Sequence, residues 1–117
     1  MNKLLPILLS SILLIGCNSN TPNCILGKWH THYPSINGYG ELHYIIDFHD
    51  NGTYCSYVNG SKTVSGEYTY SYSTNELKQF NRNEGGYVFE DTVTYKAYLQ
   101  DDVLYIEAFG KITKYTR

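Results

Sequence analysis

The chain of 117 residues has few basic residues, one short apolar run and no convincing helical period after residue 24. Nine lysines and arginines stand against eleven acidic residues, a net charge of −2, and no basic stripe is present to meet phosphates. Nucleic acid is therefore not an expected partner. The apolar run at residues 4–16 is too short for a typical membrane span. The sequence has no Gly-x-Ser-x-Gly motif, the turn that exposes the catalytic serine of α/β-hydrolases. We therefore expect no enzyme activity and no catalytic residue.

The amino terminus has the pattern of an export signal. Lys3 precedes the apolar run, which ends in "LIGC" at residues 14–17. This ending resembles the lipobox of bacterial lipoproteins. The resemblance implies cleavage between Gly16 and Cys17, diacylation of the Cys17 thiol, and acylation of the new amino group. The alternative is an ordinary signal peptide followed by a cysteine without lipid.

This assignment divides the chain into three parts. Residues 1–16 form the lipoprotein signal peptide, 17–23 the lipidated amino terminus with a polar tether, and 24–117 one folded domain. Cleavage removes Lys3 and leaves eight basic against eleven acidic residues, a net charge of −3. Acyl chains on Cys17 predict a protein anchored to a membrane of the bacterial cell envelope. By the enterobacterial sorting rule, the lack of Asp at the next position favours the outer membrane.

From Cys24 onward, apolar and polar residues alternate with a period of two, which is typical of strands. A three-residue turn at 50–52 is expected to pair Phe48 with Tyr54. Short strands joined by tight turns, without crossover helices, predict an all-β fold, an antiparallel up-and-down β-barrel that removes exposed edges by closing. The eight expected strands lie near 26–33, 40–49, 53–58, 62–72, 76–81, 87–99, 103–109 and 111–117.

The turn after Val58 has two solutions. The Asn59–Gly60 pair is typical of a two-residue turn, but simple parity then places Ser65 inside the barrel. A three-residue loop that pairs Val58 with Lys62 keeps the tyrosine-rich face of the next strand inward. We therefore prefer the three-residue loop.

Two cysteines remain once Cys17 is assigned to lipid. An oxidising compartment permits a disulfide between Cys24 and Cys55. The first and third strands of a meander are not neighbours, so the distance between them is too large for a direct disulfide. The expected Cys24–Cys55 disulfide therefore requires Cys24 to lie in a segment that crosses the outside or the end of the barrel.

The only tryptophan lies in "LGKWHTHY" at residues 26–33. This segment resembles the Gly-x-Trp opening of lipocalins and of the smaller lipocalin-like domains of bacterial lipoproteins. "IDFHDNGTY" and "SGEYTY" also resemble loose motifs of those domains. The resemblance implies that Trp29 plugs the closed end of a barrel and that Arg117 stacks across it, with a cation–π contact. Gly27 is expected to let the backbone crowd that end.

Inward-facing tyrosines are the candidate ligand-lining residues. Their rings and hydroxyls would suit a pocket for a small apolar or amphipathic ligand. The alternative is a filled interior, because an eight-stranded barrel has just enough room for its own side chains. For a domain of this size we favour the filled interior. The candidates are Tyr44, Tyr54, Tyr68, Tyr70, Tyr72 and Tyr95.

The histidines and nearby carboxylates are candidate metal ligands by type. Strand parity places them on outward faces, where such side chains normally meet water. We therefore expect no metal site, and no residue pattern indicates a cofactor. The side chains concerned are His30 and His32 on one strand, and Glu41, His43, Asp47 and His49 on the next.

Three functions are compatible with the sequence. The preferred one is a lipid-anchored lipocalin-like protein that binds a small apolar or amphipathic ligand. The alternative is a protein-binding periplasmic lipoprotein, of the enzyme-inhibitor or toxin-immunity type. Small lipid-anchored lysozyme inhibitors are barrels of about this size, although "SGEY" only approaches their Ser-Gly-x-x-Tyr motif. The third is a structural envelope protein without a dedicated ligand.

Overall fold

The structure is a computed structural model that describes residues 17, 21–34 and 40–117. The expected signal peptide, with Gly16 at its cleavage site, and part of the expected tether lie outside the described residues. Across the described ranges no helix is long and apolar enough to span a membrane. The strands in these ranges are β1 (Gly27–Tyr33), β2 (Leu42–Phe48), β3 (Thr53–Val58), β4 (Ser61–Ser71), β5 (Glu76–Glu84), β6 (Tyr87–Phe89), β7 (Val93–Gln100), β8 (Val103–Ala108) and β9 (Lys111–Tyr115).

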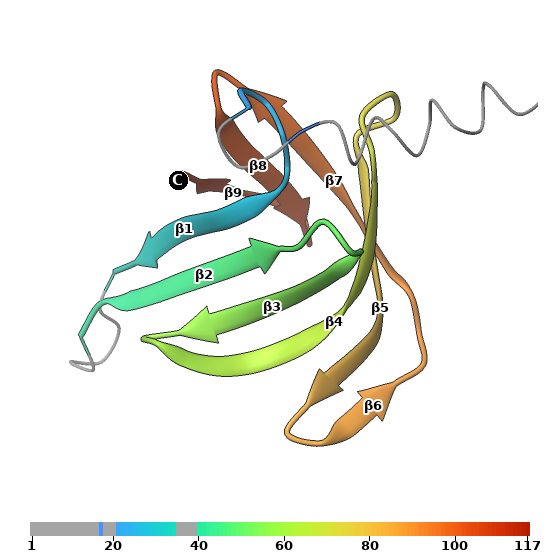
Figure 1. Cartoon of the computed structure of the whole chain (residues 1–117). Coiled ribbons are helices and arrows are strands. Elements are labelled where there is room, and N and C mark those ends of the chain that lie inside the picture. The colour runs from blue at the N-terminus through green and yellow to red at the C-terminus, as the bar shows by residue number, and fades with distance from the viewer. Residues whose placement is uncertain (1–16, 18–20, 35–39) are drawn as a thin grey trace, which may run out of the picture.

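The strands form one antiparallel sheet that curls into an almost closed barrel (Figure 1). The order along the sheet is β1-β2-β3-β4-β5-β7-β8-β9, and β6 pairs with β5 off this path. The two edges of the sheet meet at one isolated bridge. The backbone N–H of His30 donates to the carbonyl oxygen of Thr116 at 2.6 Å, and that of Thr116 donates to the carbonyl oxygen of His30 at 2.8 Å. Phe48 pairs with Tyr54. The expected up-and-down barrel and the pairing across the 50–52 turn are therefore confirmed.

The region expected to hold one strand at 87–99 contains two. β6 (Tyr87–Phe89) pairs with the end of β5, whereas β7 (Val93–Gln100) pairs with the start of β5. β5 continues to Glu84, beyond the expected end at residue 81. β5 and β7 therefore part beyond Gln79, and the β5–β6 hairpin extends past the wall of the barrel (Figure 1).

The turn after Val58 differs from the expected one. Asn59 and Gly60 have φ angles of 50° and 85° and form a two-residue turn that pairs Val58 with Ser61. The expected three-residue loop is therefore wrong. A β-bulge absorbs the additional residue instead, because the register between β3 and β4 skips Thr63. The bulge restores the inward face of β4 that the longer loop was invoked to preserve.

The residues before β1 cover one end of the barrel. Trp29 is 0 % exposed, and its Nε1 donates a hydrogen bond of 2.8 Å to the carbonyl oxygen of Ile25. The guanidinium carbon of Arg117 lies 4.0 Å from the Trp29 ring centroid. These are the two residues that the lipocalin resemblance places together. The indole and the segment at 24–26 close this end.

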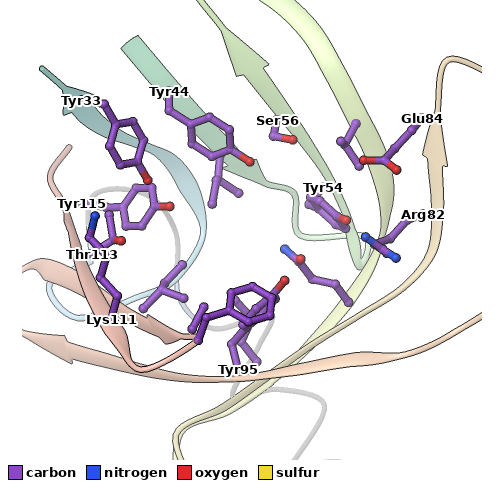
Figure 2. Close-up of a pocket in the computed structure, with 17 residues that line it drawn as sticks. Tyr33, Tyr44, Tyr54, Ser56, Arg82, Glu84, Tyr95, Lys111, Thr113 and Tyr115 are labelled. Atoms are coloured by element: carbon purple, nitrogen blue, oxygen red, sulfur yellow. The ribbon is translucent and has the colours of Figure 1, made fainter. Parts of the chain in front are cut away.

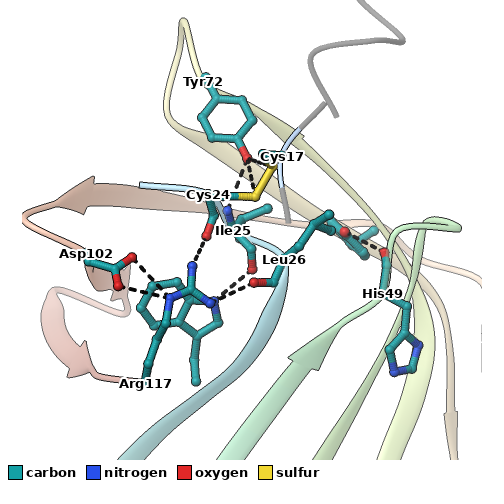
Figure 3. The surroundings of a disulfide bond; sticks show 10 residues. Cys17, Cys24, Ile25, Leu26, His49, Tyr72, Asp102 and Arg117 are labelled. Atoms are coloured by element: carbon teal, nitrogen blue, oxygen red, sulfur yellow. Dashed lines mark hydrogen bonds and ion pairs between the residues drawn. A yellow bond between two sulfur atoms is a disulfide. The ribbon is translucent and has the colours of Figure 1, made fainter. Parts of the chain in front are cut away.

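Arg117 ties the end of the chain to that segment (Figure 3). Its Nη1 donates to the carbonyl oxygen of Leu26 at 2.7 Å, and its Nη2 donates to that of Cys24. Its Nε donates to the Asp102 carboxylate, at 3.1 and 3.2 Å from the two oxygens. Side-chain donors here satisfy carbonyl groups of a buried segment that precedes the sheet.

Gly27 opens β1 with a φ angle of 108°, a conformation that side-chain-bearing residues rarely adopt. The expected reason for this glycine was crowding at the closed end. That crowding stays a prediction, and the backbone angle is a separate reason for a glycine here, because the chain turns from the end segment into β1.

The disulfide joins Cys17 to Cys24, with 5.8 Å between the two α-carbons (Figure 3). The expected Cys24–Cys55 disulfide is wrong, and Cys55 is a free, half-buried thiol on β3. Cys24 is buried where its segment turns over the end of the barrel, whereas Cys55 lies in the wall, opposite Asp47 and Ser65. The sulfur of a cysteine can form either a disulfide or a thioether, but not both. A chain with this disulfide therefore cannot also carry a diacylglyceryl thioether on Cys17.

Candidate binding pocket

A cavity of about 560 Å³ occupies the other half of the barrel (Figure 2). β1 starts at the closed end with Gly27 and reaches the cavity with Tyr33, so the cavity lies toward the opposite end. Its floor contains the buried side chains of Ile46, Leu77 and Ile106. The preference for a filled interior is therefore wrong for this half. The cavity extends to the part of β5 that lies beyond its pairing with β7, because Arg82 and Glu84 line it.

Tyrosine rings and polar groups form the walls of the cavity. Three of the six candidate tyrosines line it, namely Tyr44, Tyr54 and Tyr95. Sequence reasoning missed two more, Tyr33 and Tyr115. Continuing the parity of Trp29 along β1 would have identified Tyr33. The other polar and charged lining residues are Ser56, Gln79, Arg82, Glu84, Lys111 and Thr113.

The other three candidate tyrosines do not line the cavity. Tyr68 and Tyr70 are buried, and their hydroxyls donate hydrogen bonds of 2.8 Å to the carbonyl oxygens of His49 and Ala97. They fill the closed half. Tyr72 follows β4 and is exposed, and its hydroxyl accepts a hydrogen bond of 3.1 Å from the backbone N–H of Ile25. All three are supports of the closed end.

Burial raises the pKa of three phenol groups that line the cavity, those of Tyr54, Tyr95 and Tyr115. It raises the pKa of Tyr54 to about 12, although the nearby Arg82 cation acts in the opposite direction. Burial also raises the pKa of Tyr95, again opposed by Arg82, and the pKa of Tyr115. These three groups are therefore neutral hydroxyls, each of which can donate or accept a hydrogen bond.

Phe109 lies at the mouth of the cavity, and the residue is 99 % exposed. Phe109 and Gly110 have φ angles of 53° and 74° and form the two-residue turn between β8 and β9. A left-handed conformation is unfavourable for a bulky aromatic residue, whereas Asn adopts it readily. The turn therefore holds an apolar ring in water at a cost in backbone strain.

We expect Phe109→Asn to stabilise the protein. Relief of the left-handed strain contributes about 1 kcal/mol. Thermal unfolding followed by circular dichroism is expected to show a melting temperature higher by roughly 4–8 °C. Ile112→Asn is the matched control, because Ile112 is an exposed apolar residue of β9 outside this turn, and it should give no such rise. An unchanged melting temperature for Phe109→Asn would contradict the strain argument.

Three histidines lie together on the outer face of β1 and β2. Nδ1 of His30 lies 2.8 Å from Nε2 of His43, and the rings of His32 and His43 stack with centroids 4.4 Å apart. His32 also contacts the Glu41 carboxylate at 2.6 Å. His49 instead lies beside Asp47, 3.4 Å away. Among the described residues, no group of three His, Cys, Asp or Glu side chains is placed to hold a metal ion.

The histidine cluster predicts a loss of stability in acid. Burial, followed by the charges of His43, His32 and Lys28, lowers the pKa of His30. The unfolded chain then binds the proton more readily, so the stability from neutral His30 is complete above about pH 6.5 and is lost below it. Urea unfolding at pH 7.5 and 5.5 should show a smaller acid loss for His30→Gln. An equal loss in the variant would assign the effect to other groups.

No protein-family model matches this chain, and neither the curated proteins nor the solved structures gave a match. Its class is therefore defined by its own fold and cavity. It is an antiparallel up-and-down β-barrel, plugged by an indole in one half and hollow in the other.

Proposed function

We propose that this protein is a lipid-anchored binding protein of the bacterial cell envelope that holds a small apolar or amphipathic ligand inside its barrel. The cavity is the observation that carries the proposal. Its volume of about 560 Å³ falls within the roughly 300–1,000 Å³ that is usual for small-molecule sites. An apolar floor with polar groups at the walls is also the usual composition of such sites.

Binding is tested by titration with an environment-sensitive apolar dye. We expect saturable binding to the parent protein and about tenfold weaker binding to Ala108→Trp, because the indole would occupy space inside the cavity. Ile112→Trp is the matched control, since Ile112 is exposed and does not line the cavity. Each variant is first checked for an unchanged circular dichroism spectrum. No saturable binding by the parent, or equal binding by Ala108→Trp, would contradict the proposal.

The lipid anchor is proposed from the "LIGC" sequence at residues 14–17. It competes with the disulfide for the Cys17 sulfur. Mass spectrometry of the protein purified from bacterial envelopes should find Cys17 as the amino-terminal residue, with two acyl groups on its glyceryl thioether and one on its nitrogen. In that form Cys24 and Cys55 are both thiols. Buried Cys24 should react with iodoacetamide only after denaturation.

The same mass spectrometry measurement can also contradict the lipid anchor. A chain that carries the Cys17–Cys24 disulfide and no lipid would contradict the anchor. Ligand binding by the cavity would remain a separate question, decided by the dye titration.

A second candidate function is protein binding, and the β5–β6 hairpin is the observation that favours it. Tyr87 and Val88 are exposed on this hairpin, and Tyr87 packs against Phe89. Exposed apolar side chains that lie together are typical of interaction surfaces. The double variant Tyr87→Ser with Val88→Ser should abolish capture of a protein partner without weakening dye binding. Loss of dye binding in this variant would contradict a separate protein surface.

A further inference from the structure

A guanidinium group forms part of the cavity wall. Arg82 lies on β5 where that strand leaves β7, and 23 % of its side chain is exposed. Its Nη2 donates to the Asp91 carboxylate, at 3.2 and 3.4 Å from the two oxygens. The guanidinium carbon also lies 5.0 Å from the Phe89 ring centroid. Asp91 and Phe89 do not line the cavity, so they contact the guanidinium group from outside it.

The Nε of Arg82 is the unsatisfied part of this group. It is buried and has no hydrogen-bond partner among the residues that the structure describes. A buried donor without an acceptor is costly, and the guanidinium cannot reduce that cost by losing its proton. Figure 2 shows the guanidinium beside Tyr54 on one side of the cavity. Because Nε is not accessible to a water-sized group, a ligand in the cavity would meet Arg82 through the rest of its guanidinium group.

The charge of the cavity favours an anionic acceptor. The charged side chains among the described lining residues are Arg82, Lys111 and Glu84, a balance of one positive charge in a chain whose net charge is −2. The remaining wall groups, such as Tyr54 and Tyr95, are neutral phenols that can donate further hydrogen bonds. The lining by itself therefore complements one negative group, although Asp91, outside the lining, already pairs with one side of Arg82.

The floor of the cavity determines which tail the ligand can have. Leu77 and Ile106 are buried in the floor and carry no polar atoms in their side chains. An entirely polar anion would leave this apolar surface without a partner, and an entirely apolar molecule would leave the guanidinium group of Arg82 without an acceptor on the cavity side. A ligand with an anionic head and an apolar tail fits both.

We propose that the ligand is an amphiphile with a single anionic headgroup, a carboxylate or a phosphate monoester, held by the guanidinium group of Arg82 while its tail lies against Leu77 and Ile106. This inference rests on the proposed binding function and specifies its ligand class. Carboxylate and phosphate oxygens both match the planar donor geometry of a guanidinium, which an ammonium group does not reproduce.

Photoaffinity labelling of the full chain in envelope membranes tests the inference. Three probes share one long alkyl tail with a diazirine near its end, and they carry a carboxylate, a phosphate monoester or a neutral hydroxyl as head. We expect the anionic probes to label peptides of β5 and β8, the strands that hold Leu77 and Ile106. Stronger labelling by the phosphate probe would indicate a phospholipid-derived ligand, and stronger labelling by the carboxylate probe a free fatty acid.

Variants of Arg82 identify the headgroup contact. Arg82→Met should reduce labelling by the preferred anionic probe about tenfold, with less than a twofold change for the hydroxyl probe. Arg82→Lys should retain part of the labelling because it keeps the charge. Lys78→Met is the matched control, since Lys78 is an exposed cation of the same strand outside the cavity, and it should have no effect.

A second variant covers the case in which Arg82→Met does not fold. Asp91→Asn removes the acidic partner of Arg82 and leaves the cavity lining intact, so it should increase labelling by the anionic probes. Unchanged labelling in Asp91→Asn, or in Arg82→Met, would overturn the inference, as would loss of the anion preference only in Lys111→Met. Equal labelling by all three probes would overturn the headgroup assignment and leave the binding function in place. Absence of labelling by every probe would contradict the binding function itself.

Discussion

Replacing Trp29 with alanine lowers the free energy of unfolding by about 3–5 kcal/mol, the usual range for a buried aromatic residue. The ring is fully buried, and the variant would lose its packing, its hydrogen bond to Ile25 and the surface on which Arg117 lies. Urea unfolding followed by circular dichroism measures the change, because the substitution removes the only tryptophan available to fluorescence.

Trp29→Phe is the control for the size of the ring. It keeps an aromatic surface beneath Arg117 but removes the hydrogen-bond donor and part of the volume, so its loss of stability should be clearly smaller than that of Trp29→Ala. A loss below about 1 kcal/mol for Trp29→Ala, the size of an ordinary surface change, would contradict the role of the indole as the plug of the barrel.

The second large effect is expected for Arg117→Met. The substitution leaves two carbonyl oxygens, those of Cys24 and Leu26, without their charged donor and also removes the ion pair with Asp102. A charged hydrogen bond contributes roughly 1.5–3 kcal/mol, and partial exposure of this side chain reduces the total, so we expect a loss of about 2–3 kcal/mol. Urea unfolding of the parent and the variant measures it.

Two further variants, Arg117→Lys and Lys114→Met, are the controls for this measurement. Lysine keeps the charge but cannot provide the planar set of donors or the same stacking, so its loss should be intermediate. Lys114 is an exposed cation of the last strand, and its replacement should change stability by no more than about 0.5 kcal/mol. A double-mutant cycle of Arg117→Met with Trp29→Ala, which removes the aromatic surface, should give a coupling energy of about 0.5–2 kcal/mol. Additive effects would show that the stacking contributes little.

The period-two alternation was sufficient to predict the barrel, because side-chain parity is a local property of an extended chain. It was not sufficient for the turn after Val58. The register there depends on a bulge at Thr63, which changes parity without any change in composition. The preferred loop was wrong for this reason, although the inward face that it was meant to preserve is the observed one.

Parity also explains the partial success with the candidate site. It identifies tyrosines that face inward but not their height along the barrel, so Tyr68 and Tyr70 fill the closed half whereas Tyr44 and Tyr95 line the cavity. Tyr72 lies just after β4 and outside the alternation. Its hydroxyl meets the end segment instead, 3.1 Å from the Ile25 N–H nitrogen.

Two features that depend on contacts distant in the sequence, the disulfide and the position of Arg82, could not be predicted from local sequence patterns. The position of Cys24 depends on a segment that turns over the barrel end, so its disulfide partner could not be deduced from strand order. Arg82 was missed because the fifth strand was expected to end at residue 81. Its place in the wall follows from the continuation of that strand toward Glu84 and its pairing with β6.

The plugged half of the barrel also determines how the molecule faces its surroundings. The chain enters the barrel at that half, through Cys24 and Ile25, while Phe109 and Lys111 mark the opposite rim. A tether at residue 17 would therefore attach the molecule by its blind side, with the opening directed toward the aqueous compartment. Cargo would then have to arrive by diffusion or from a soluble carrier, because lipid moving sideways within the bilayer would meet only the sealed base.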